Sequence, residues 1–434
     1  MRYLIFYSFL LIISCSRQVD SNNAPIPDLA SIEAIQIDSG FFLGPCEPTI
    51  CINPANPDNV IAGSVLDNVY VSNDGGKSWT KNAMESSYGV FGDPVIRIDN
   101  EGRIYYAHLS NPTGRAYADP EFLDRIVIQR SDDKGLNWTD GSFTLPRTPK
   151  DQDKEWLAID PDDHTVYISW TEFDLYSSKD PNDKSRILFS KSGDLGDSWT
   201  YPVVLSQLEG NCLDDDQTTE GAVPAVGPEG QIYVAWSYDE NIYFDRSYDK
   251  GESWMKEDIL VSDQPGGWTY DIPGIMRCNG MPICAVDRSS GPHKGTVYIN
   301  WSDQRNGTDD TDIWLSRSTD DGTSWSDPVR VNDDLPGKHQ FFCWMDIDQS
   351  TGYIYIVFYD RRNFDDETTD VFLAYSSDGG KSFKNTKINK SSFKPNNAVF
   401  FGDYNDISAH EGRVRPIWTQ LDGPKLSVWT ALIN

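Results

Sequence analysis

The stretch Ser72-Asn-Asp74-Gly-Gly76-Lys-Ser-Trp79 decides the fold, because five further copies of the same pattern follow it along the chain. Each copy reads Ser-x-Asp-x-Gly-x-x-Trp, with phenylalanine as the aromatic residue in the last one. The other copies begin at Ser131, Ser192, Ser247, Ser318 and Ser376. In such a turn the aspartate accepts hydrogen bonds from backbone amides, the glycine adopts a left-handed conformation, and the aromatic ring packs between sheets. The motif is therefore structural, since its own turn occupies its polar groups.

The repeated turn resembles the Asp box, or BNR repeat, of sialidases and related β-propeller proteins. Its copies recur at intervals of 55 to 71 residues, which suits a four-stranded blade with its connections. The resemblance covers nearly the whole chain after the N-terminal segment. It implies an all-β propeller whose site lies at the central channel.

Alternating apolar runs between the turns predict the number of blades. Seven candidate inner strands begin near Glu47, Asp93, Lys154, Glu220, Met281, Phe341 and Asp403. The last set has three strands, and the segment 34–38 could supply its missing outer strand, so that no sheet edge stays exposed. We therefore predict a seven-bladed β-propeller with six Asp boxes, closed by an N-terminal strand in the last blade. A six-bladed ring, as in sialidases, is the alternative.

The N-terminal residues have the features of an exported lipoprotein. Residues 1–14 join a basic start at Arg2 to an apolar stretch that is too short to span a bilayer, as in a secretory signal peptide. The sequence before Cys15 resembles a bacterial lipobox, in which this cysteine carries the lipid; an ordinary signal peptide is the alternative. Residues 15–30 are predicted to form a flexible tether and residues 31–434 a single propeller domain. The expected location is a bacterial outer membrane surface.

Charge and cysteine content restrict the partners and the cofactors. A net charge of -30 argues against nucleic acid, so we expect a monomer that meets the membrane only through its lipid and takes carbohydrate as its partner. Six cysteines follow Cys15, and an exported protein can pair them in up to three disulfides, of which Cys278–Cys284 is the most economical pair. Zinc is disfavoured because no histidine stands at ligand spacing from these cysteines.

Propeller geometry predicts which polar residues share a face. The starts of inner strands and the ends of second strands open opposite to the Asp-box turns, so we discount residues in those turns, such as Arg288. We expect Glu47, Asp93, Glu220 and Asp403 to form an acidic ring at the mouth of the channel, with Lys154 beside it. Further substrate-binding candidates on this face are Asp303, Arg305, Gln340, Asp360 and Arg362. The alternative is that these charges form internal salt bridges that brace long loops.

The acidic ring and the family resemblance together suggest a function. Two carboxyl groups across a gap can hydrolyse a glycosidic bond, and Asp93, Glu220 and Asp403 are the acid and base candidates. Sialidases use a tyrosine nucleophile, so the resemblance implies this role for Tyr404. The expected protein is a surface-anchored glycoside hydrolase of the sialidase superfamily that acts on glycans. Its activity could be that of an exo-α-sialidase. However, the Arg-Ile-Pro motif of sialidases is absent, and Arg97 lies further along its strand.

Two other functions remain open at this point. The first is a non-catalytic propeller that binds carbohydrate or protein. The second is a polysaccharide lyase, in which His108 or His339 would act as the base. No cofactor is expected, although Asp214, Asp215 and Asp216 could donate oxygen atoms to calcium. They lack the spacing of a calcium-binding loop, which favours a solvated acidic loop.

Overall fold

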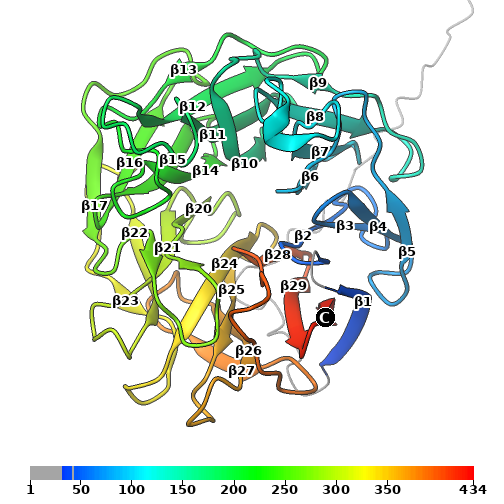
Figure 1. Cartoon of the computed structure of the whole chain (residues 1–434). Coiled ribbons are helices and arrows are strands. Elements are labelled where there is room, and N and C mark those ends of the chain that lie inside the picture. The colour runs from blue at the N-terminus through cyan, green and yellow to red at the C-terminus, as the bar shows by residue number, and fades with distance from the viewer. Residues whose placement is uncertain (1–31, 42–43) are drawn as a thin grey trace, which may run out of the picture.

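A computed structural model describes residues 32–41 and 44–434 of the chain. Seven four-stranded antiparallel sheets stand around a central axis like the blades of a propeller (Figure 1). The predicted all-β fold and its seven blades are confirmed, and the six-bladed alternative is wrong. The predicted signal peptide, the lipidated Cys15 and the tether all lie outside the described residues. No helix in the described part is long and apolar enough to cross a membrane.

The strands of each blade follow one another outward from the axis. The inner strands are β2 (Thr49–Ile52), β6 (Val95–Ile98), β10 (Asp151–Ile159), β14 (Glu220–Val226), β20 (Ile283–Val286), β24 (Gln340–Asp348) and β28 (Asp406–His410). The second strands are β3 (Val60–Ser64), β7 (Ile104–Leu109), β11 (Val166–Phe173), β15 (Ile232–Tyr238), β21 (Val297–Asp303), β25 (Tyr353–Asp360) and β29 (Arg413–Asp422). We number the blades 1 to 7 in this order.

The two remaining layers complete the blades. The third strands are β4 (Asn68–Ser72), β8 (Ile126–Ser131), β12 (Ser185–Ser192), β16 (Asn241–Ser247), β22 (Asp312–Ser318), β26 (Asp370–Ser376) and β30 (Lys425–Leu432). The outer strands are β5 (Thr80–Ala83), β9 (Ser142–Phe143), β13 (Val203–Val204), β17 (Ile259–Asp263), β23 (Val329–Arg330), β27 (Lys384–Lys387) and, in blade 7, β1 (Glu33–Phe41). A short 3₁₀ helix, η2 (Ala116–Ala118), and a two-stranded hairpin, β18 (Thr269–Tyr270) with β19 (Cys278–Asn279), lie in connecting loops.

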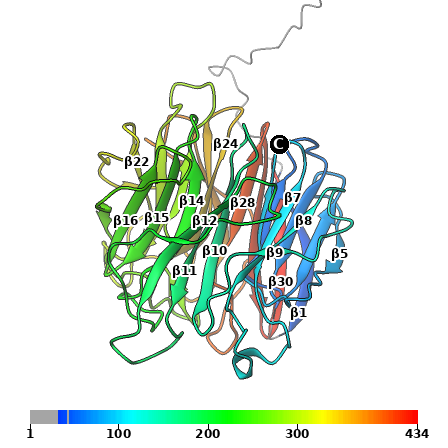
Figure 2. The same ribbon diagram turned by 90° about the horizontal axis from the view of Figure 1, so that it is seen from above.

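Blade 7 joins the two ends of the described chain. Strand β1 pairs antiparallel with β30, from Glu33 opposite Leu432 to Phe41 opposite Lys425. The side view shows β1 next to β30 (Figure 2). This pairing gives the last blade its fourth strand and links early and late segments in one sheet, which leaves the ring without a three-stranded blade.

Each repeated turn has its own set of hydrogen bonds. In the first copy, Ser72 Oγ donates to Asp74 Oδ1 at 2.8 Å, and the amide of Gly76 donates to Ser72 Oγ at 2.9 Å. The glycine also meets the preceding blade: at Gly251, with φ of 82°, an added Cβ would lie 2.5 Å from Phe189. A larger residue there would disturb both the turn and the contact between blades 3 and 4.

The interior of blade 4 contains a carboxyl group, that of Asp245, which burial keeps partly protonated at neutral pH. Asp245 on β16 is fully buried; its Oδ1 accepts from the amides of Arg246 at 2.6 Å and Met255 at 3.1 Å. Its Oδ2 has no hydrogen-bond partner among the described residues. Burial raises the pKa of Asp245 to about 7, although the two amide bonds oppose this shift. The folded protein therefore holds a proton here that the unfolded chain releases near pH 4.

We expect Asp245→Asn to stabilise the protein at pH 8 and to change it little at pH 4. Because the folded pKa is raised, the stability that the protonated carboxyl provides is complete below about pH 4 and is lost as pH rises through about 7. The asparagine cannot ionise, so the free energy of unfolding at pH 8 should rise by about 2–4 kcal/mol. Urea denaturation at both pH values checks this, with the exposed Asp327→Asn as control. An equal effect at both pH values would contradict it.

Candidate functional site

The inner strands begin at one mouth of the central channel with an unusual backbone conformation. Glu47, Asp93 and Lys154 have φ of 51°, 46° and 52°, in the left-handed region that side chains other than glycine rarely adopt. In blade 3 the register then shifts between Asp153 and Trp156, which marks a bulge. The same conformation recurs at Phe342 in blade 6, with φ of 50°, so it is a feature of the repeated strand starts that border the channel.

Three of the predicted residues meet at this mouth in one buried ion cluster. Lys154 Nζ lies 3.1 Å from Asp93 Oδ2 and 3.0 Å from Asp403 Oδ2, so the contact joins blades 3, 2 and 7. Only 5% of Lys154, 7% of Asp93 and 2% of Asp403 is exposed. A lysine this buried requires charged partners, which explains why both carboxylates face it.

A second cation in the cluster is Arg277, which the sequence did not single out. It lies between β18 and β19, in the connection from blade 4 to blade 5. Its Nε donates to Asp403 Oδ1 at 2.8 Å, Nη2 also binds this carboxylate, and Nη1 donates to Asp214 Oδ2 at 3.0 Å. The available signal was the length of the connection, because the interval between Ser247 and Ser318 is the longest between repeated turns.

Electrostatics divide the carboxyl groups of the mouth into two kinds. Burial alone would raise the pKa of Asp403, but Arg277 and Lys154 outweigh burial and hold this pKa well below its usual range. Burial, reinforced by Asp93 and Asp403, raises the pKa of Glu47 well above its usual range. Burial likewise raises the pKa of Asp153 to about 7, against the attraction of Lys154. The mouth thus holds an ionised carboxylate at Asp403 and a protonated carboxyl group at Glu47, the division that acid and base catalysis needs.

Glu47 and Glu220 differ in their position relative to Asp403. Gly402 packs against the backbone and side chain of Glu47, so Glu47 adjoins the residue before Asp403. Glu220 is fully buried, and neither of its side-chain oxygens has a hydrogen-bond partner in the described part of the chain. Burial and then Asp214 raise its pKa well above the usual range. Both residues therefore carry protons, and Glu47 is the one next to Asp403.

Tyr404 faces the aromatic interior of the channel. Its ring packs edge-on against Trp156, with centroids 5.1 Å apart, and its hydroxyl has no hydrogen-bond partner among the described residues. Burial, followed by the charges of Asp93 and Glu47, raises its pKa well above the usual range. A phenol in these surroundings stays protonated, so the arrangement does not activate Tyr404 as a nucleophile.

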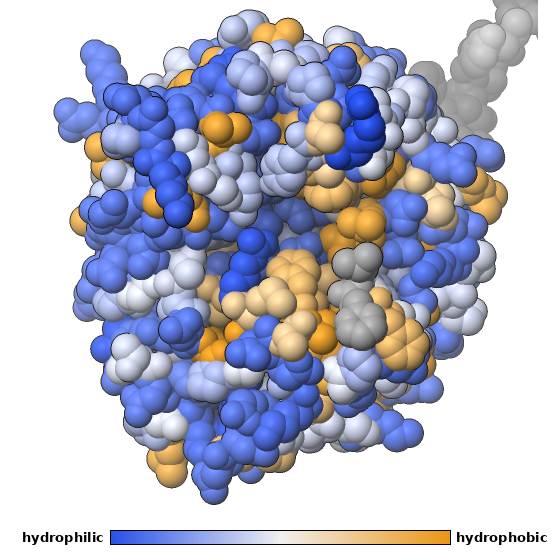
Figure 3. Space-filling model, in the orientation of Figure 1, coloured by the Kyte–Doolittle hydropathy of each residue, from blue (hydrophilic) through white to orange (hydrophobic). Residues whose placement is uncertain are grey.

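A small cavity opens beside the ion cluster. Its volume is about 90 Å³, and its lining residues are Asp214, Trp268, Thr269, Arg277, Cys278, Asn279 and Asp403. Trp268 Nε1 donates to Asp214 Oδ1 at 2.8 Å. Figure 3 shows this face of the ring with hydrophilic side chains over the blades and apolar ones gathered near the centre. The cavity can receive one polar group of a ligand, such as a carboxylate or a hydroxyl.

The structure does not bring the remaining predicted binding residues to this mouth. Arg305 pairs with Asp303 at 2.6 Å and its guanidinium lies 4.7 Å from the Trp314 ring centre. Arg362 pairs with Asp360 at 2.8 Å. Gln340 is fully buried and bonds to Asn332 and Asp334. These groups brace the loops of blades 5 and 6, as the alternative of internal salt bridges predicts. Each arginine pairs with a carboxylate two residues before it.

Neither histidine considered as a lyase base belongs to the cluster. His108 is fully buried in blade 2, where its Nδ1 lies 2.9 Å from the carbonyl of Leu109, and burial lowers its pKa to about 4. His339 contacts Thr311 at 3.1 Å in the loops of blades 5 and 6, and burial again lowers its pKa to about 4.

The acidic loop and the cysteines also differ from a metal site. Asp214 is engaged by Arg277, Trp268 and Tyr176, and Asp216 accepts the amide of Thr269 at 2.8 Å. Within residues 32–41 and 44–434 no group of three or more His, Cys, Asp or Glu side chains could hold a metal ion. Asp214 is therefore engaged by protein partners, and calcium at this loop stays a prediction. The Cys278–Cys284 pairing is wrong for this structure, in which all six described cysteines are free thiols.

Comparisons with known proteins identify the fold only. No protein-family model and no curated protein matches the chain. A solved ulvan lyase of polysaccharide lyase family 25 is similar, with 13% identity over 91% of this chain and 95% of that one at a TM-score of 0.52. A protein of unknown function from Dyadobacter fermentans has 13% identity over 79% and 93% of the two chains at a TM-score of 0.50. The sialidase NanB from Streptococcus pneumoniae has 9% identity over 86% and 83% at 0.50.

Proposed function

We propose that this chain is a glycan-acting propeller, a glycoside hydrolase whose chemistry takes place at the mouth that holds Asp403. The observation that carries the proposal is the division of protonation: Asp403 is held ionised by Arg277 and Lys154, while Glu47 beside it is protonated. Two carboxyl groups in opposite states supply the base and the acid that cleavage of a glycosidic bond requires.

The other residues of the mouth take supporting roles in this proposal. Arg277 is the accessible cation, with 40% of its side chain exposed, so it would bind an acidic or hydroxyl-rich sugar. Lys154 binds the Asp403 carboxylate, and Asp93 binds Lys154. Glu220 is a second carboxyl group whose pKa burial raises, but it is fully buried. A sialidase-like reaction through Tyr404 would require a base for its hydroxyl.

A non-catalytic binding propeller is the second candidate. Its support is the small exposure of the cluster, since Glu47, Asp93, Lys154 and Asp403 are each less than one-tenth exposed. In that case the ion cluster would stabilise the mouth, and the surface around Arg277 would only bind.

The test is release of products from a panel of glycans, followed by mass spectrometry. The panel contains sialosides, neutral oligosaccharides and uronate polysaccharides. Release of a saturated sugar supports the proposed hydrolase, and release of sialic acid adds sialidase-like specificity. An unsaturated uronate would identify a lyase instead. If no glycan is cleaved but one of them binds, the protein is a binding propeller.

We further propose that the propeller is displayed on a membrane surface through a lipid on Cys15. Cys15→Ser is expected to move the protein from the detergent phase to the aqueous phase in phase partitioning, because each buried methylene of the acyl chains contributes roughly 0.8 kcal/mol to anchoring. Globomycin treatment of the producing cells should leave the unprocessed form of the wild-type protein. The same partitioning of wild type and variant would show that Cys15 carries no lipid.

A further inference from the structure

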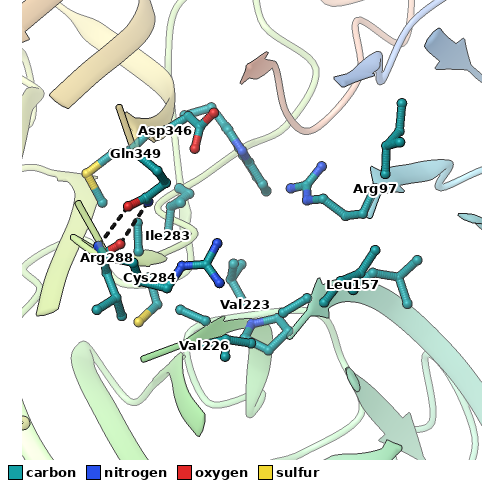
Figure 4. Close-up of a pocket in the computed structure, with 18 residues that line it drawn as sticks. Arg97, Leu157, Val223, Val226, Ile283, Cys284, Arg288, Asp346 and Gln349 are labelled. Atoms are coloured by element: carbon teal, nitrogen blue, oxygen red, sulfur yellow. Dashed lines mark hydrogen bonds between the residues drawn. The ribbon is translucent and has the colours of Figure 1, made fainter. Parts of the chain in front are cut away.

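A second group of charged side chains lies in the central channel, toward the ends of the inner strands. Two adjoining cavities, of about 210 and about 370 Å³, share Arg97, Arg288, Trp344 and Asp346 in their linings. Arg97 belongs to β6 in blade 2, whereas Arg288 follows β20 in blade 5. Figure 4 shows the two guanidinium groups extending from opposite sides toward the middle of the cavity.

The charge of Arg97 is balanced, whereas that of Arg288 is not. Arg97 Nη1 donates to the carbonyl of Ile96 at 2.7 Å and lies 3.3 Å from Asp406 Oδ2. Arg288 Nη1 is buried but has no hydrogen-bond partner in residues 32–41 and 44–434. Burial lowers the pKa of this guanidinium, and the carboxylates nearest to it only partly offset the effect. A buried guanidinium nitrogen that lacks a partner is costly, and a bound anion would remove this cost.

Asp346 does not supply the missing counterion. Its Oδ1 accepts from the amide of Ile347 at 2.8 Å, and its Oδ2 accepts from the amide of Ala409 at 2.7 Å. Burial raises its pKa to about 7, so its charge is incomplete at neutral pH. The carboxyl group is thus committed to backbone donors, while Arg288 stays available.

The inner strands of blades 3, 4 and 5 form the rest of the lining, where polar backbone groups lie beside apolar residues. The apolar residues are Leu157, Ala158, Val223, Ala225, Val226 and Ile283. Gln349 fixes the backbone that carries Arg288: it accepts from the Arg288 amide at 2.7 Å and donates to the carbonyl of Val286 at 3.0 Å. These bonds are the dashed lines in Figure 4. The cavity therefore combines a basic side, at Arg97 and Arg288, with strands that present both backbone groups and apolar residues.

We propose that the smaller of these two cavities, of about 210 Å³, binds a small organic carboxylate. Its carboxylate group would lie between Arg97 and Arg288, and its apolar body would contact β10 and β14. The volume suits a ligand of the size of a single aromatic ring. The site is separate from the mouth around Asp403 and does not depend on the function proposed for it.

Calorimetric titration with benzoate tests the proposal, and its neutral isostere benzamide is the matched control. Benzoate should bind and benzamide should not, and Arg288→Gln should weaken benzoate binding at least tenfold. Arg317→Gln, whose guanidinium donates to the carbonyl of Gly379 outside the cavity, should leave the affinity unchanged. Equal binding of benzamide, or binding of sulfate without benzoate, would overturn the organic carboxylate class. Loss of benzoate binding in Arg277→Gln rather than Arg288→Gln would place the anion at the mouth and overturn the site.

Thermal melting gives an independent readout. In a zwitterionic buffer without added carboxylates, Arg288→Gln should melt at a higher temperature than wild type, because the variant removes a buried guanidinium nitrogen that lacks a partner. Benzoate should raise the melting temperature of the wild type and leave that of Arg288→Gln unchanged. Arg288→Lys keeps the charge and should retain part of the benzoate response. If Arg288→Gln melts below wild type and benzoate shifts both equally, the arginine is structural and the proposal is overturned.

Discussion

Asp403→Asn is expected to reduce glycan cleavage by about 10³-fold or more while the protein stays folded. The variant keeps the size of the side chain but removes the negative charge that Arg277 and Lys154 hold in place. An amide can neither accept a proton nor attack the sugar, so the step that needs an ionised carboxylate fails. Folding should survive because Lys154 keeps Asp93 as a partner and Arg277 keeps Asp214. Initial rates on the released-sugar substrate, together with melting curves, measure both effects.

Asp312→Asn is the matched control for this experiment. Asp312 is fully buried and pairs with Arg330 at 2.6 Å in blade 5, away from the mouth. It should lose some stability and keep its rate per folded molecule. If Asp403→Asn and Asp312→Asn retained equal activity, the carboxylate of Asp403 would be a structural brace. The proposal for the catalytic site would then fail even if the protein cleaved glycans.

The periodicity of the sequence could predict the fold and part of the site. Strand starts repeat from blade to blade, so the positions of Asp93, Lys154 and Asp403 follow from counting strands, and these side chains meet as expected. The type of charged residue alone could not distinguish residues of the mouth from residues that brace the loops. From the sequence, Arg305 and Arg362 are as suitable for substrate binding as a residue of the mouth. However, each pairs with an aspartate two residues before it, which neutralises its charge.

Residues outside the repeat could not be placed in the same way. Arg277 belongs to an insertion that occurs once, so no second copy showed where its side chain would point. Because Arg288 follows an inner strand on the side of the repeated turns, the sequence predicts no binding role for it. Its side chain nevertheless points into the cavity in the channel (Figure 4). In both cases a single loop returns toward the axis, and its path depends on packing that periodicity does not encode.

Lys154→Met is expected to lower the free energy of unfolding by about 3–5 kcal/mol, because it leaves a buried carboxylate without its cation. Lys154 is 5% exposed and lies within 3.1 Å of two carboxylates. Methionine fills similar space but leaves Asp93 without its cation in a buried site, whereas Asp403 keeps Arg277. Urea denaturation measures the loss, with Lys338→Met as a control expected to cost less than about 1 kcal/mol, because its partner Asp365 is fully exposed.

The double variant Lys154→Met with Asp93→Asn separates loss of charge balance from loss of packing. If the single variant is unstable because the Asp93 carboxylate is left unpaired, then removing that charge should restore a large part of the stability, with a coupling energy of about 1–3 kcal/mol. If the double variant is instead as unstable as the sum of both single variants, the lysine stabilises the mouth through packing of its aliphatic chain. The ion pair across blades 2 and 3 would then contribute little, and the cluster would owe its geometry to the left-handed strand starts alone.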